Sequence, residues 1–324
     1  MNTRRRKIAN ALALSPTLAA LPASAQPAYP NKPLRFVVSF APGGPADIIA
    51  RLLGQKLTET LGQPVVVENR AGAGGNVATA ATAKAQPDGY TLLVTTSAYA
   101  VNPSLSRNAG YDPEKDFVAV SIVAASPNIL VSTPSLNFRT LQEALAEAKS
   151  GRLNYATAGA GTTPHLTAEY LFKVLAKVDV THVPFQGGSP AVTAAAGGQV
   201  QIACVALPSA VEMVKAGRVR GLAVTGARRV ASLPDVPTVA ESGYPGFDEN
   251  TWTAVFAPAG TPADIVGKLN AEINAILRTA DFQARLAAVT FEAVGGSPAD
   301  AAAFVKRELV KWPRLVRETG ARAE

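Results

Sequence analysis

Apolar and polar positions follow two rhythms along this chain, and the two alternate almost from end to end. Residues 34–40, LRFVVSF, form a short run of β-branched and aromatic residues that is typical of a buried strand. In 46–62 the apolar residues, among them Ile48 and Leu52, recur at helical spacing, and Gly62 ends the pattern. Strands that alternate with helices predict parallel sheets flanked by helices.

The same two rhythms predict the remaining elements. Further strands are expected at 64–69, 90–97, 153–157, 180–185, 199–207, 220–226 and 251–258. Further helices are expected at 77–85, 140–150, 165–176, 191–198 and 209–217, with three more between 258 and the C-terminus.

The run 117–132 is longer than one strand needs, and Pro127 interrupts it. We interpret it as a crossing between two domains, with a second crossing in the Pro- and Gly-rich segment 231–250. The predicted first domain is therefore discontinuous, residues 26–126 and 248–324, and the second is 127–247. The expected fold class is α/β, with a mainly parallel sheet in each domain and a ligand cleft between the domains.

The N-terminus predicts export. Residues 4–7, RRRK, precede the mostly apolar segment 8–22 and then Ala23-Ser24-Ala25, which is the order of an export signal, with cleavage after Ala25. A membrane anchor needs about 18 uninterrupted apolar residues, and this segment is shorter and interrupted. The triple arginine leaves the general and the twin-arginine export routes both open.

Charge and cysteine content exclude several classes. Residues 1–25 hold four of the 31 basic residues and none of the 24 acidic ones, so residues 26–324 carry 27 basic and 24 acidic residues, a net charge of +3. No dense basic block interleaved with aromatics occurs, so no nucleic-acid partner is expected. The lone Cys204 excludes an internal disulfide and a thiolate metal site, and two histidines make a weak metal case.

Four predicted strand-to-helix junctions are rich in glycine: 42–45 (PGGP), 72–75 (GAGG), 159–163 (GAGTT) and 187–190 (GGSP). A glycine-rich helix start lets an anion approach the unpaired N–H groups of the first helical turn. Two junctions come from each predicted domain, so together they predict a clamp for a carboxylate.

Two polar side chains near these junctions have more than one interpretation. Asp47 in the first helical turn complements the helix dipole more readily than it contacts a ligand. For His165, ligand contact and packing at the helix start both stay open, whereas His182 in a strand is expected to be a packing residue. The motifs GxSxG, HExxH and GK[ST] are absent, and GAGGNVA fits the dinucleotide fingerprint poorly.

Many segments resemble the Bug receptors, which are periplasmic solute-binding proteins of tripartite tricarboxylate transporters. The segments that carry the resemblance are YPNKPLRFVVSFAPGGPADIIARLL, LGQPVVVENRAGAGGN, PDGYTLLVTTS, LNYATAGAGTTPHLTAEYLF, HVPFQGGSPAVTAAAGGQV and LPDVPTVAESGYPGF. The resemblance implies a periplasmic, type II-like two-domain protein that closes on a small organic acid, such as a dicarboxylate or an aromatic acid. It also implies delivery to membrane permease subunits, without catalysis or a cofactor; we expect a monomer.

The resemblance also implies where the ligand binds. This chain departs from the family where Phe185-Gln186 replaces the usual Tyr-Lys, where Ala160 replaces Asn, and where 204–206, Cys-Val-Ala, replaces Phe-Asp-Asn. The predicted ligand-binding residues are Phe40, Ala41, Gly43, Gly44, Pro45, Asp47, Ser97, Ala160, Gly161, Thr162, Thr163, His165, Phe185, Gln186, Gly187, Ser189 and Val205.

The three departures predict a less polar wall, and we expect a preference for an acid with an apolar or aromatic body over an amino acid or citrate. Two alternatives stay open. One is a sensory adaptor that docks on a membrane sensor. The other is an exported enzyme in which His165 activates Ser97, Thr162 or Ser189.

Overall fold

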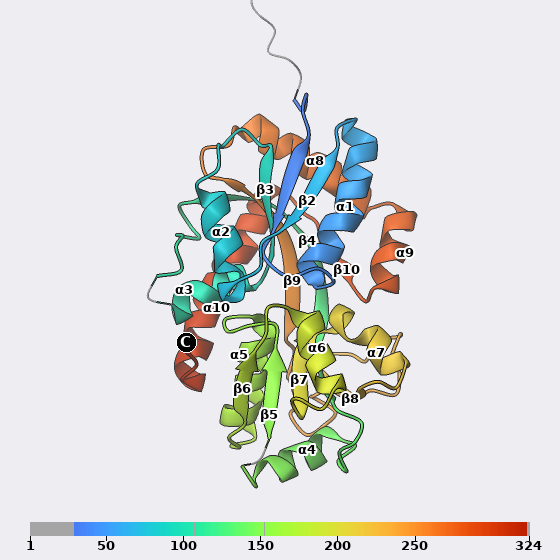
Figure 1. Cartoon of the computed structure of the whole chain (residues 1–324). Helices are drawn as coiled ribbons and strands as arrows, with labels where there is room; N and C mark the ends of the chain where they lie inside the picture. The colour runs from blue at the N-terminus through green and yellow to red at the C-terminus, as the bar shows by residue number, and fades with distance from the viewer. Residues whose placement is uncertain (1–28, 107, 152, 323–324) are drawn as a thin grey trace, which may run out of the picture.

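Two α/β lobes, one above the other, are joined by long strands that run from one into the other (Figure 1). This computed structural model describes residues 29–106, 108–151 and 153–322. The predicted export signal, residues 1–25, lies outside the described residues. No helix in the described ranges is both long enough and apolar enough to cross a bilayer.

The upper lobe is built on a sheet in which β1 pairs in parallel with β2 and β3, and β9 lies between β3 and β4. Its strands are β1 (Leu34–Val38), β2 (Val65–Asn69), β3 (Thr91–Thr96), the first part of β4 (Phe117–Ser132), β9 (Asn250–Pro258) and β10 (Glu292–Ala293). Its helices are α1 (Pro45–Leu61), η1 (Ala73–Gly75), α2 (Asn76–Ala83), α3 (Ala98–Leu105), α8 (Ala263–Leu277), α9 (Ala280–Ala288) and α10 (Pro298–Thr319).

The lower lobe repeats the arrangement around β5, which pairs in parallel with β6 and β7. Its strands are β5 (Asn154–Thr157), β6 (Thr181–Pro184), β7 (Ile202–Ala206), β8 (Arg220–Val224) and the end of β4. Its helices are α4 (Leu141–Ala148), α5 (Thr163–Glu169), the π-helical η2 (Tyr170–Leu175), α6 (Gly188–Ala196), η3 (Leu207–Ser209) and α7 (Val211–Lys215).

Strand β4 is the predicted crossing, and it is one continuous strand. Phe117 to Pro127 pair with β9, whereas Asn128 to Ser132 pair with β7. Because β4 and β9 are antiparallel neighbours at the junction of the lobes, the sheets are mixed. The expectation of mainly parallel sheets therefore holds only for the outer strands. The α/β architecture in two lobes is confirmed, and the domain boundaries at 126/127 and 247/248 stay a prediction.

Apolar side chains fill both faces of each sheet. In the upper lobe, Ile49 and Leu53 of α1 pack with α8 on one face, and Tyr99, Phe256 and Trp312 pack on the other. In the lower lobe, α4, α5 and η2 cover one face, and α6 covers the other. This burial on both sides explains the nearly continuous apolar strands in the sequence.

Candidate ligand-binding site

Asp47, in the first turn of α1, holds the loop that precedes this helix through its carboxylate. The N–H of Gly43 donates to Asp47 Oδ2 at 2.9 Å, Asn69 Nδ2 donates to Oδ1 at 2.9 Å, and Arg51 adds an ion pair at 2.9 Å. Burial alone would raise the pKa of Asp47, but the hydrogen bonds from Arg51, the Gly43 N–H and Asn69 outweigh it and keep that pKa below its usual value. Asp47 therefore shapes the loop, and its side-chain oxygens are already occupied.

The loop before α5 is organised in the same way by His165. Its Nδ1 accepts the N–H of Gly161 at 3.2 Å, and its backbone N–H donates to Thr162 Oγ1, which caps the helix. The residue is 3% exposed. Within the described residues its ring has no hydroxyl partner, so the geometry for activating Ser97, Thr162 or Ser189 is not formed.

His165 and His182 stack, with ring centroids 4.1 Å apart, and His182 Nε2 bonds Thr157 Oγ1 at 2.7 Å. Burial, with a smaller contribution from Lys173, lowers the pKa of His165 to about 4. Burial and the neighbouring His165 lower the pKa of His182 to about 3. Both rings are therefore neutral near pH 7 and serve as packing and hydrogen-bonding groups.

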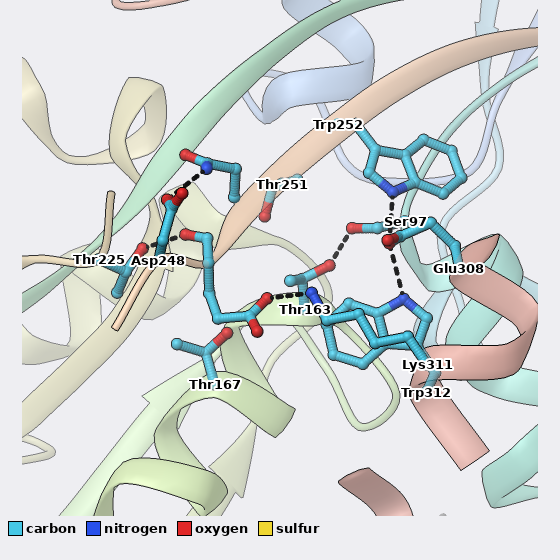
Figure 2. A network of polar contacts seen from close by, with 12 residues as sticks. Ser97, Thr163, Thr167, Thr225, Asp248, Thr251, Trp252, Glu308, Lys311 and Trp312 are labelled. Carbon is cyan, nitrogen blue, oxygen red and sulfur yellow. Dashed lines mark hydrogen bonds and ion pairs between the residues drawn. The ribbon is translucent and has the colours of Figure 1, made fainter. Parts of the chain in front are cut away.

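The two lobes are in contact across the cleft through hydroxyl side chains that were among the predicted ligand-binding residues. Ser189 Oγ donates to the carbonyl of Gly43 at 3.0 Å. The hydroxyls of Ser97, at the start of α3, and Thr163, in α5, hydrogen-bond to each other and are both buried (Figure 2). These three side chains join the lobes in the present arrangement, which is a closed one.

Glycine is required where the lobes approach most closely. A Cβ on Gly161, whose φ is +78°, would lie 1.7 Å from Asn102 Oδ1 on α3. A Cβ on Gly74, with φ +62°, would lie 2.1 Å from the carbonyl oxygen of Ala160. Ala41 and Gly187 meet in the same way, since a Cβ on Gly187 would lie 3.2 Å from Ala41 Cβ. These glycines let backbone from opposite lobes come into contact.

Three helices begin around a small chamber between the lobes, of about 20 Å³. In the chamber wall, the N–H groups of Gly44 and Gly188 have no hydrogen-bond partner within the described residues. The chamber wall also contains Ser209, whose buried Oγ is unpartnered among the described residues. The chamber is lined by Phe40, Gly44, Pro45, Thr96, Ala158, Thr162, Pro164, Gly188, Ala206, Ser209 and Thr251.

Three helix N-termini around one small volume create a positive potential and leave N–H donors unpaired. A carboxylate group is attracted by this potential and can accept hydrogen bonds from these donors. A volume of about 20 Å³ holds about one water molecule or one small polar group and no complete organic acid.

A larger cleft of about 440 Å³ shares Phe40 and Ala158 with the chamber. Among the described residues its wall contains apolar and neutral polar side chains and no charged one. The wall is formed by Phe40, Gly72, Ala73, Gly74, Gly75, Asn76, Asn102, Ser106, Asn108, Ala158, Gly159, Ala160, Pro184, Phe185 and Gln186. The body of an acid whose carboxylate enters the chamber would extend into this cleft.

The structure corrects one predicted contact. Val205 is fully buried in the core of the lower lobe with Ile129 and Val192, and Cys204 is buried on the opposite face of β7 with Tyr155. Only Ala206 of the triplet 204–206 reaches the chamber. Side chains alternate along a strand, so neighbouring positions cannot all face one wall. Of the triplet 204–206, only Ala206 therefore contributes to the expected apolar wall of the ligand site. The other apolar side chains of that wall are those of Phe40 and Phe185.

Several lining residues were not predicted from the sequence. Asn102 Nδ2 bonds the Gly74 carbonyl at 3.0 Å and Asn76 Oδ1 at 2.7 Å, which fixes the 72–75 loop against the 159–163 loop. Ser209 ends η3, which follows the buried strand β7. In the sequence, the available signal was a hydroxyl in the LPSA segment close behind an apolar strand. No group of three or more His, Cys, Asp or Glu side chains suited to a metal ion occurs in the described part of the chain.

Comparison with known proteins gives the family. The profile of the tripartite tricarboxylate transporter family receptor, TctC, matches residues 49–321. BugT of Bordetella pertussis is 39% identical over 307 residues, which cover 94% of this chain and 94% of that protein.

Two solved structures extend the similarity to the fold. "R. palustris Rpa4515 with adipate" is 36% identical with a TM-score of 0.86, covering 91% of this chain and 99% of that one. "MatC (Rpa3494) from Rhodopseudomonas palustris with bound malate" is 36% identical with a TM-score of 0.84, covering 89% and 100%. The predicted two-lobed binding-protein fold is confirmed, and the family is one of transport receptors rather than enzymes. This chain belongs to the TctC/Bug family of periplasmic solute-binding receptors of tripartite tricarboxylate transporters.

Proposed function

We propose that this receptor binds a small organic acid by one carboxylate at the chamber and delivers it to the membrane subunits of a tripartite tricarboxylate transporter. The observation that carries the proposal is the convergence of α1, α5 and α6 on a chamber with unpaired N–H donors and the unpartnered Ser209 hydroxyl. Solved relatives at 36% identity with bound malate and with adipate support a dicarboxylate as ligand.

The body of the ligand lies in the outer cleft, between Phe40 and Phe185. About 440 Å³ accommodates a short dicarboxylate or a single aromatic ring. Of the described wall residues, neutral donors such as Gln186, together with water, would hold a second carboxylate. The receptor is exported, loses residues 1–25, and acts as a monomer.

The test is a thermal-shift screen of residues 26–324 with malate, adipate, benzoate, citrate and aspartate. A ligand at about 100 times its Kd raises the free energy of unfolding by about 2.7 kcal/mol. A shift with one class of acid supports the proposal and decides between a dicarboxylate and an apolar-bodied acid. Absence of any shift, in protein shown by mass spectrometry to hold no trapped ligand, would contradict it.

Ser209→Ala tests the position of the carboxylate. Loss of one hydrogen bond to a charged group weakens binding by about 1.5–3 kcal/mol. The matched control is Ser232→Ala, which removes a second unpartnered buried hydroxyl outside the chamber and the cleft. Calorimetric titration should show weaker binding for Ser209→Ala and unchanged binding for Ser232→Ala. Equal affinities would place the carboxylate elsewhere.

A further inference from the structure

The outer face of α10 carries a cluster of exposed cations. Lys306, Arg307, Arg314 and Arg317 are exposed, and Val310 between them is 73% exposed. At 100° per residue these five positions fall within an arc of about 100°. We call this set the basic face of α10.

The positive charge of this face is largely uncompensated. Arg314 pairs with Glu318 at 2.7 Å, and Lys306, Arg307 and Arg317 have no ion pair within the described residues. Four cations against one acid leave a local excess of three positive charges on this face. Solvated single charges are normal on a protein surface, but here three cations without an ion pair lie together on one helix face.

The opposite side of α10 is already occupied. Val305 and Trp312 are buried in the core of the upper lobe, and Phe304 and Leu309 pack beside them. The helix therefore has no free apolar face to insert into a bilayer. Three of the four cations are arginines, whose planar forks bind carboxylates in a bidentate manner. This chemistry favours Asp and Glu side chains of another polypeptide.

Helix α10 lies against both lobes. The helix contacts α3 and β4 of the upper lobe and α5 and η2 of the lower lobe, and it lies along both in Figure 1. Its Lys311 pairs at 2.6 Å with Glu249, in the segment that enters β9, and Glu308 accepts the indole N–H groups of Trp252 and Trp312 (Figure 2).

We propose that the basic face of α10 is the docking surface for an acidic segment of the receptor's membrane partner. The inference rests on the receptor function proposed above and specifies where the partner binds and with what chemistry.

The experiment measures binding of poly-L-glutamate to the mature chain that carries a fluorophore at Ala302→Cys, beside the basic face. The native Cys204 is fully buried, and burial raises the pKa of its thiol, so the label attaches at the surface. Titrations run at low salt and at about 0.15 M ionic strength. Arg307→Glu with Arg317→Glu should weaken binding about tenfold, which is about 1.4 kcal/mol.

The matched control is Arg139→Glu with Lys149→Glu, which makes the same charge change at two exposed residues of the lower lobe. A loss below about twofold in the control supports the proposal, since about 0.4 kcal/mol is within the range of a non-local charge effect. An equal loss in both variants would overturn it. Tighter binding to phosphatidylglycerol vesicles than to poly-L-glutamate, lost in the α10 variant, would also overturn it by assigning the face to a membrane surface.

The thermal shift with the acids of the screen described above is measured on the same variants. A retained shift together with lost poly-L-glutamate binding shows that the docking face and the ligand site are separate, as proposed. Absence of the thermal shift in the unmodified chain, once mass spectrometry shows no trapped ligand, would refute the receptor function while leaving the poly-L-glutamate result readable in its own right.

Discussion

Asp47 and His165 belong to the loops of the ligand site, yet each uses its polar atoms on the loop itself. The Asp47 carboxylate accepts a hydrogen bond from the Gly43 N–H, and His165 Nδ1 accepts one from the Gly161 N–H. The donors that remain for a ligand are backbone N–H groups at the starts of α1 and α6 and the Ser209 hydroxyl. Backbone donors fixed by rigid helices need little reorganisation when a carboxylate arrives.

Comparing Gly161→Ala with Gly198→Ala should separate the effect of backbone strain on stability from the effect of lobe closure on ligand affinity. The new Cβ would collide with Asn102, whereas Gly198→Ala, at a φ of +73°, meets nothing within 4 Å. Both variants should lose about 1–2 kcal/mol of stability from the left-handed backbone. Only Gly161→Ala should also lose ligand affinity, by at least about tenfold, because its closed state is disfavoured. Equal affinities in a calorimetric titration would contradict this role.

The buried histidine pair predicts a loss of stability on acidification. The pKa values of His165 and His182 are lowered to about 4 and about 3, while the unfolded chain titrates near 6.5. Between these values the unfolded state binds more protons, so the free energy of unfolding falls as pH falls below 6.5. We expect a loss of roughly 1 kcal/mol per histidine between pH 7.5 and 5.5 in urea titrations.

His165→Asn with His182→Gln is the comparison for this prediction. Neither new side chain titrates in this range, and Asn can still accept the Gly161 N–H. The stability of the variant should depend less on pH between 7.5 and 5.5 than that of the unmodified chain. Parallel pH profiles would show that other groups cause the dependence.

The glycine-rich helix starts could be predicted because strand, glycine and helix are adjacent in the sequence. Asn102 and Ser209 could not, because their neighbours lie far away along the chain: Gly161 is 59 residues from Asn102. Val205 was misplaced since a strand that is apolar on both faces does not reveal which side faces a cleft.

At the scale of elements, most predicted strands and helices are present with shifted ends. The unpredicted α3 is short and contains Pro103, so no helical period was visible. The predicted helix 165–176 is α5 followed by the π-helical η2, a change of hydrogen bonding that apolar spacing does not encode. The mixed sheet follows from β9, which comes after the whole lower lobe in the sequence and lies antiparallel between β3 and β4.

Helix α10 is attached to the inter-lobe segment by the Lys311–Glu249 ion pair. Burial raises the pKa of Glu249, Lys311 opposes that rise, and the carboxylate side chain is 16% exposed. Lys311→Met should therefore destabilise the protein by about 1–3 kcal/mol, since it leaves a carboxylate buried and unpaired. Urea unfolding measures the loss.

Two further variants test whether the buried, unpaired charge of Glu249 causes the loss of stability in Lys311→Met. Adding Glu249→Gln to Lys311→Met should restore part of the stability, because the buried charge is removed. Lys215→Met breaks a pair whose Glu212 is 79% exposed and should change stability by less than about 0.5 kcal/mol. A loss as large for Lys215→Met as for Lys311→Met would contradict the role of burial.

At the scale of the whole molecule, the closed arrangement places Gly43 and Ser189 of opposite lobes in contact. A Cβ built on Gly43 lies 3.8 Å from Ser189 Cβ, which is about the mean Cβ separation in disulfides. Gly43→Cys with Ser189→Cys should therefore form an inter-lobe disulfide on oxidation. Non-reducing electrophoresis and mass measurement detect it.

The oxidised double variant should exchange bound acid far more slowly than its reduced form, because the lobes cannot separate. Each single variant under the same oxidising conditions is the control, and the buried Cys204 does not compete. Exchange of labelled ligand measures the effect. Equal exchange rates in the oxidised and reduced forms would show that ligand leaves without opening of the lobes.

The position of β9 between β3 and β4 also sets an order of events during folding. The strands of the lower lobe, from the end of β4 to β8, lie within one stretch of chain, so this lobe can assemble as soon as that stretch is available. The upper sheet waits for β9 and for the helices behind it, and until then β3 and β4 expose unpaired edges. The folding chain is therefore most vulnerable to aggregation and proteolysis before its last quarter is in place.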